Sequence, residues 1–226
     1  MSLSTGRGPL SARPAGRFTA PVPAEVAYIE PFRRRVRGQQ GGRTVIDSER
    51  VLLVHRPGRP PAYAFPDDDV HGPNAEPEPD TPGYVIVAWD AVDAWFEESE
   101  QVHGHPRNPY HRIDILHSER ALRVDVGRIT LVDTRDTLVV YETALEPKLY
   151  VDPRHVQMDA LERSATTTYC PYKGTASYWS YRAGEDTVED VAWSYEDPLP
   201  ESVPLSGFLS FEESRVSLRH DLPAGG

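Results

Sequence analysis

The segment Tyr169–Tyr181 reads YCPYKGTASYWSY and holds the only cysteine of the chain, Cys170, with Lys173 three residues later. Pro171 fixes its own φ and pushes Cys170 toward an extended conformation, so the residues from Cys170 to Lys173 suit a β-turn. Gly174 follows this turn directly and is free to adopt a positive φ. The segment therefore predicts a tight turn that brings a thiol and an amine close together.

Two interpretations of Cys170 stay open. An ammonium group beside a thiol favours the thiolate, so Lys173 could make Cys170 a nucleophile. Alternatively, Cys170 is a small buried apolar residue and Lys173 is a solvated residue of the turn.

Two runs of alternating aromatic residues, SYWSY at 177–181 and VAWSY at 191–195, are separated by turn residues at 182–186. They predict a β-hairpin in which the odd-numbered residues of both runs share one face. Aromatic residues in such numbers fill a core or wall a ligand site, because the polar tips of Tyr and Trp need partners when buried. The predicted aromatic face holds Trp179, Tyr181, Trp193 and Tyr195, with Ser177 and Val191 beside them.

The composition favours many short elements over long helices. The 22 prolines and 16 glycines break a chain of 226 residues into many short elements. A hydrophobic content of 38% allows one large domain or two small ones with their own cores.

Charge and cysteine content exclude several kinds of partner. A net charge of -11 argues against nucleic acid or an anionic membrane as the main partner. One cysteine excludes an internal disulfide framework and a zinc site that needs several thiolates. No apolar run approaches the roughly 20 residues of a membrane span, and no signal peptide is recognisable. A cytoplasmic protein with no cofactor is expected, and its oligomeric state is left open.

The expected domain organisation has four parts. Residues 1–24 form a flexible tail, 25–102 a degenerate first β-domain, 103–112 a linker and 113–222 a complete second β-domain. The linker holds three histidines, but no cysteine or acidic residue lies among them, so no metal is expected there. Residues 67–80 read as an acidic loop, and 92–96 as a strand end or a short helix. Strands are expected around 44–46, 51–54, 62–65, 84–89, 122–126, 129–132, 138–141, 149–151, 207–211 and 216–218.

The two halves of the chain are related in sequence. Residues 52–54 match 138–140 at an offset of 86, whereas 83–85 match 207–209 at an offset of 124. The extra 38 residues lie between Val156 and Gly207 and contain the cysteine turn with the aromatic hairpin. A function tied to that insertion should therefore exist once per chain.

The pattern YCPYKG followed by ASYWS, then DVAWSY at 190–195 and a Pro-rich stretch before Gly207, resembles domain of unknown function 427 (DUF427). The resemblance covers roughly residues 123–221, and residues 36–101 look like the same framework without the hallmark. It implies an all-β protein with little helix, built of two related small domains in tandem. Each domain is expected to be a tent or sandwich of two sheets, similar in outline to methionine sulfoxide reductase B.

Proteins of that outline hold zinc with paired Cys-x-x-Cys motifs. Lys173 stands where the second cysteine would be, so zinc is not expected here. The family is sometimes connected with nucleotidyl transfer, but this sequence does not support that activity. It has neither a phosphate-binding glycine loop nor a carboxylate pair suited to magnesium.

Three functions remain, and whether the protein is an enzyme stays open. The first is a module that binds a small molecule beside the Cys170–Gly174 turn, with Lys173 contacting an anionic or carbonyl group. The second is an enzyme with Cys170 as nucleophile, Lys173 as its activator, and His155 and Asp190 as candidates for the base and the orienting group. The third is a structural or protein-interaction domain. The candidate ligand-binding residues are Tyr169, Tyr172, Lys173, Gly174, Ser177, Trp179, Trp193 and Tyr195.

Overall fold

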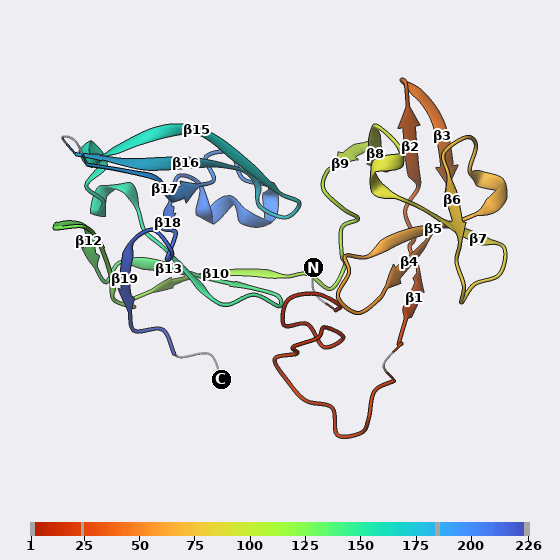
Figure 1. The fold of residues 1–226 in the computed structure, drawn as a ribbon, viewed down its shortest axis with the longest axis horizontal. Coiled ribbons are helices and arrows are strands. Elements are labelled where there is room, and N and C mark those ends of the chain that lie inside the picture. Colours follow the sequence, from red (N-terminus) through yellow and green to blue (C-terminus); the bar gives the residue numbers. More distant parts are fainter. Residues whose placement is uncertain (1–2, 24, 184–185, 224–226) are drawn as a thin grey trace. The chain divides into compact units, whose positions relative to one another are not determined.

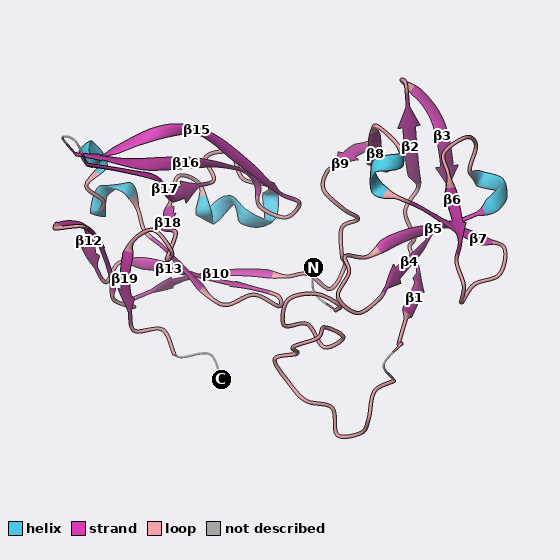
Figure 2. Ribbon diagram, viewed as in Figure 1, coloured by secondary structure: helices cyan, strands magenta, loops and turns pink. Residues whose placement is uncertain are grey.

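The computed structural model describes residues 3–23, 25–183 and 186–223. Within these ranges strands dominate and the helices are short 3-10 turns, which confirms the predicted all-β class (Figure 2). None of the helices so described is both long and apolar enough to cross a membrane. The chain divides into two compact units, Met1–His111 and Arg112–Gly226, called here the first and second unit (Figure 1).

The first unit contains two antiparallel sheets, in the strand orders β1-β4-β5-β7-β6 and β3-β2-β8-β9. Its core lies around Phe65 and Trp95, whose rings stack at a centroid distance of 5.9 Å. The elements are β1 (Tyr28–Pro31), β2 (Val36–Gln40), β3 (Arg43–Ser48), β4 (Leu52–His55), β5 (Ala62–Pro66), η1 (Asp67–Asp69), β6 (Ala75–Pro77), β7 (Tyr84–Val87), η2 (Trp89–Ala91), β8 (Ala94–Glu97) and β9 (Glu100–Val102).

The second unit contains three sheets, in the orders β10-β13-β14, β12-β11-β19 and β15-β16-β17-β18. The elements are β10 (Ile113–Ser118), β11 (Leu122–Val126), β12 (Ile129–Thr134), β13 (Thr137–Glu142), β14 (Lys148–Tyr150), η3 (Pro153–His155), η4 (Met158–Ala160), β15 (Leu161–Cys170), β16 (Gly174–Ala183), β17 (Asp186–Ser194), η5 (Pro200–Leu205), β18 (Leu209–Phe211) and β19 (Ser217–His220).

The strand ladders of the two units correspond in register. The bulge that follows Gly38 in the β2–β3 ladder recurs after Val124 in the β11–β12 ladder, 86 positions later. The ladders β1–β4 and β10–β13 correspond at the same offset, as do β4–β5 and β13–β14. Two isolated bridges complete the correspondence, Ile46–Val70 in the first unit and Val132–Val156 in the second.

The predicted strands are present, and the differences have simple causes. The segment 92–96 leads into strand β8, which is Ala94–Glu97 and not a helix, and β7 ends at Val87 because residues 89–91 turn as η2. The expected acidic loop contains the short strand β6, which pairs with β7. Strands β1, β2, β9, β10 and β15 were not predicted. Most of β15 is exposed, so its sequence has no regular apolar alternation.

The tail and the linker contain no strand in the described residues. Ser4 of the tail is buried, and its hydroxyl donates a hydrogen bond to the carbonyl of Arg59 at 2.6 Å. The flexibility of this tail stays a prediction.

Strand β13 carries apolar residues on both of its faces and so separates two clusters of the second unit. Val139 joins the main cluster with Leu131, Tyr181 and Phe211. Leu138 and Val140, which point the other way, join a smaller cluster with Tyr150, Ala176, Tyr195 and Leu205. The candidate site lies at the edge of this smaller cluster.

Candidate binding site

The predicted turn forms between β15 and β16. Cys170 and Gly174 are the last cross-strand pair of this ladder, and the residues between them reverse the chain. Gly174 has φ +96°, as its place after the turn predicted. The backbone N–H of Leu199 donates to the carbonyl of Lys173 at 3.1 Å, and Ser202 donates to the carbonyl of Tyr172 at 3.3 Å. The segment that leads into η5 therefore holds the turn in place.

The ammonium group of Lys173 forms an ion pair with Glu142, at the end of β13. The two side chains are only 10% and 9% exposed, so the pair is buried. The ammonium nitrogen also lies 5.9 Å from the centroid of the Tyr195 ring. Glu142 was not predicted, because it lies 31 residues before Lys173 in the sequence.

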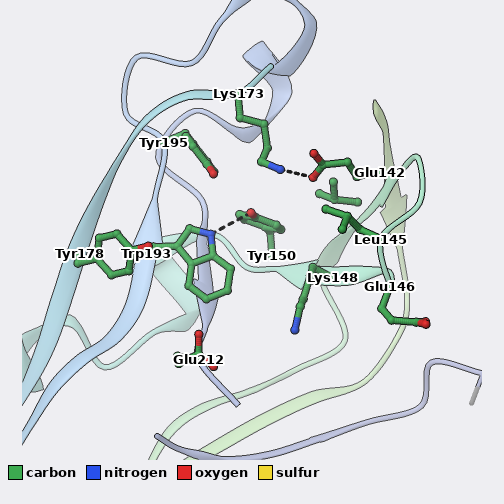
Figure 3. Close-up of a pocket in the computed structure, with 11 residues that line it drawn as sticks. Glu142, Leu145, Glu146, Lys148, Tyr150, Lys173, Tyr178, Trp193, Tyr195 and Glu212 are labelled. Atoms are coloured by element: carbon green, nitrogen blue, oxygen red, sulfur yellow. Dashed lines mark hydrogen bonds and ion pairs between the residues drawn. The ribbon is translucent and has the colours of Figure 1, made fainter. Parts of the chain in front are cut away.

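A cavity of about 370 Å³ opens beside this ion pair. In Figure 3 the pair lies at one end of the cavity, Glu146, Lys148 and Glu212 lie at the other end, and rings lie between them. The lining residues are Val140, Glu142, Leu145, Glu146, Lys148, Tyr150, Lys173, Tyr178, Trp193, Tyr195 and Glu212.

The aromatic wall is built by strand pairing. Tyr178 of β16 lies opposite Trp193 of β17 in the ladder, so both side chains point to the same face. The indole N–H of Trp193 donates to the hydroxyl of Tyr150 at 3.0 Å, and the two rings meet edge to face. Tyr195, two residues after Trp193, continues the same face. These contacts fix the rings in place without a ligand.

The predicted aromatic face is wrong for half of its members, because Trp179 and Tyr181 pack with the main cluster and do not line the cavity. Trp179 lies opposite Ala192 and packs against the main cluster, on the face opposite the cavity, where its indole N–H donates to Ser194 at 3.0 Å. Ser177 shares that face and accepts a hydrogen bond from Arg163.

The error comes from the register. Ala183 pairs with Asp186 beside the turn, so odd-numbered residues of β16 lie opposite even-numbered residues of β17. A slip of one residue moves every side chain to the other face. An irregularity in the β16–β17 ladder follows Trp179, close to Asp190 with its φ of +48°. Val191 therefore joins the main cluster instead of lying beside Trp193. The predicted link includes residues 184–185, which are outside the described residues.

The other predicted site residues are distributed as follows. Lys173, Trp193 and Tyr195 line the cavity, whereas Tyr172 and Gly174 are buried in the turn and do not line it. Tyr169 is exposed. Cys170 is half-buried and packs against the smaller cluster without lining the cavity.

His155 and Asp190, the candidates for the base and the orienting group of an enzyme, each contact other residues. His155 pairs with Asp136 at 3.1 Å, and Asp190 accepts hydrogen bonds from Ser164 and Thr166. Among the described residues, no group of three or more His, Cys, Asp or Glu side chains is arranged to hold a metal ion.

Several residues that line the cavity were not predicted from the sequence, although two features of the sequence indicate them. Glu142 continues the alternation of Leu138 and Val140 along β13, so the three side chains share a face. Tyr150 follows the apolar Leu149 in a strand that the sequence did predict. Neither feature shows which strands face each other. Only the folded structure gives that information.

Burial raises the pKa values of the Tyr150 and Tyr195 phenols above their usual range. The hydrogen bond from Trp193 acts in the opposite direction on Tyr150 but does not outweigh burial. Both phenols are therefore neutral at physiological pH, where they offer hydroxyl groups and not charges.

The fold and the site together define an all-β domain with an aromatic cavity closed at one end by a buried lysine–glutamate pair. Residues 114–221 match the family model described as a domain of unknown function (DUF427). The match runs from within β10 to just past β19 and includes every residue that lines the cavity. This part of the chain is therefore similar to DUF427 proteins. No curated protein matches the chain in sequence.

Proposed function

We propose that the second unit binds a small organic molecule in the cavity between β13–β14 and β16–β17. The observation that carries this proposal is a single hollow of about 370 Å³ that combines four aromatic rings with a few charged groups. Ligand sites in proteins typically have volumes of about 300–1,000 Å³ and mostly apolar walls with a few placed polar groups.

The arrangement of the walls favours binding over a purely structural role. Trp193 is held by its hydrogen bond to Tyr150, and Lys173 is held by Glu142. Because these side chains are already fixed, little of the binding free energy is spent on ordering them. A solid core would have left no hollow at this position.

We also propose that the first unit is a diverged copy that serves as a framework. Its ladders share the register of the second unit at an offset of 86 residues, bulge included. Its sequence lacks the 38-residue insertion that supplies Lys173, Tyr178, Trp193 and Tyr195. One binding site per chain is the expected stoichiometry.

The test is a thermal-shift screen of the full chain against small metabolites of positive, negative and no charge. A ligand of the native state raises the melting temperature by mass action. Leu145→Trp adds a large ring at an exposed residue of the cavity wall and should abolish the shift produced by any true ligand. Leu116→Trp, at an exposed residue of β10 that does not line the cavity, is the matched control and should keep it.

Two results would contradict the proposal. One is a screen without stabilising compounds combined with fast alkylation of Cys170 by iodoacetamide at neutral pH, which would favour an enzyme. The other is stabilisation that Leu145→Trp leaves intact, because the ligand would then bind elsewhere.

A further inference from the structure

The cavity is acidic overall. Its charged lining residues are Glu142, Glu146, Lys148, Lys173 and Glu212. Both ammonium groups already have carboxylate partners, since Lys173 pairs with Glu142 and Lys148 pairs with Glu213 just outside the lining. The three carboxylates of Glu142, Glu212 and Glu213 thus outnumber the two ammonium groups. The anionic partner expected for Lys173 is supplied by the chain itself, and the surplus negative charge repels an anionic ligand.

The rings of the cavity suit a cation. A positive charge within about 6 Å of a Trp or Tyr ring centroid is attracted by the ring quadrupole, and Trp is the best partner. The ammonium group of Lys173 already lies 5.9 Å from the centroid of Tyr195. Tyr150, Tyr178 and Trp193 line the space between Lys173 and the acidic end at Glu212 (Figure 3).

Resting on the binding function proposed above, we infer that the ligand carries a quaternary ammonium group, held among Tyr150, Tyr178 and Trp193. An aromatic wall attracts positive charge but gives N–H donors few acceptors. A quaternary ammonium group has no N–H to satisfy, so burial among rings leaves no donor unpaired. Glu212, at the other end of the cavity from the buried ion pair, supplies long-range attraction.

Isothermal titration of the full chain with choline tests this inference. The control ligand is 3,3-dimethylbutan-1-ol, which has the shape of choline with carbon in place of the charged nitrogen. Choline should bind at least about tenfold more tightly than the alcohol, because the ring quadrupoles attract the charged nitrogen and not the neutral carbon that replaces it. Acetate should not bind.

Matched variants locate the effect. Trp193→Phe should weaken choline binding severalfold, and Glu212→Gln should weaken choline binding while leaving the binding of the alcohol unchanged. Trp179→Phe alters the neighbouring strand on the face opposite the cavity and should bind choline as the parent does. A thermal melt of each variant shows whether it is folded.

The outcomes separate the two proposals. Equal affinity for choline and the alcohol, no detectable choline binding, or choline binding that Trp193→Phe does not change, overturns the quaternary ammonium inference. If neutral or anionic compounds then give stabilisation that Leu145→Trp abolishes, the binding function survives without this ligand class. If no compound does, both proposals fail.

Discussion

Between individual residues, the most important contact of the site is the buried ion pair of Lys173 and Glu142. Lys173 was expected to lie beside Cys170, but its partner is Glu142. The carboxylate comes from β13 and the ammonium group from the turn before β16, so the pair joins two sheets. A charge buried in this way needs its partner, since removal of one member leaves the other without compensation.

Glu142→Gln should therefore lower the free energy of unfolding by about 3–5 kcal/mol, because the ammonium group of Lys173 loses its counter-charge. Urea denaturation measures the change. Glu213→Gln breaks the exposed pair with Lys148 and should cost less than about 1 kcal/mol. Equal losses in the two variants would show that the Lys173–Glu142 pair is not buried in solution.

The buried tyrosines predict a loss of stability at alkaline pH. Burial raises the pKa values of Tyr150 and Tyr195 in the folded state above the value of about 10 in an unfolded chain. The two phenols contribute fully to the free energy of unfolding below about pH 10. This contribution is lost as the pH rises further, because the phenols then lose their protons in the unfolded chain but keep them in the folded protein.

Urea denaturation at pH 8 and pH 11 should show this loss, and Tyr150→Phe should make it smaller. Tyr169→Phe, at an exposed tyrosine outside the cavity, should leave it unchanged. A phenol absorbance change near pH 10 in the folded protein that Tyr150→Phe removes would contradict the burial of that ring.

Among the elements, the hairpin of β16 and β17 shows what a sequence can and cannot predict. Period-two alternation in the aromatic runs identified both strands, because that pattern follows from local geometry. The register did not follow, because it is set beside the turn, where Ala183 pairs with Asp186 and odd-numbered residues of β16 therefore lie opposite even-numbered residues of β17. The turn at Gly174 was predictable, since proline and glycine act locally. The role of Glu142 was not predictable, because its contact with Lys173 joins residues 31 positions apart that only the folded chain brings together.

The turn itself can be tested through Gly174. A side chain at φ +96° is strained, and a Cβ there would lie 3.4 Å from the carbonyl oxygen of Asp197 and from the backbone nitrogen of Leu199. Gly174→Ala should cost more than the roughly 1–2 kcal/mol of the backbone strain alone. Gly127→Ala, at φ +59° with no atom within 4 Å of the new Cβ, is the control and should cost only the strain. Equal losses in urea denaturation would show that the turn is not closely packed.

At the scale of the whole molecule, each unit has its own buried core and its own sheets. A segment with a complete core is expected to fold alone. Residues 112–226, expressed separately, should unfold in one cooperative transition and retain the ligand specificity of the full chain, whereas residues 1–111 should fold without binding. A segment 112–226 that lacks near-ultraviolet circular dichroism would contradict this division.

The central claim is that the cavity beside Trp193 is a ligand site, and the indole N–H signal of Trp193 tests it most directly. In a nuclear magnetic resonance titration with choline, the claim predicts a saturable shift of the Trp193 signal and an unmoved Trp179 signal, because only Trp193 faces the cavity. Saturable choline binding, seen by titration calorimetry, that leaves the Trp193 signal in place would contradict it.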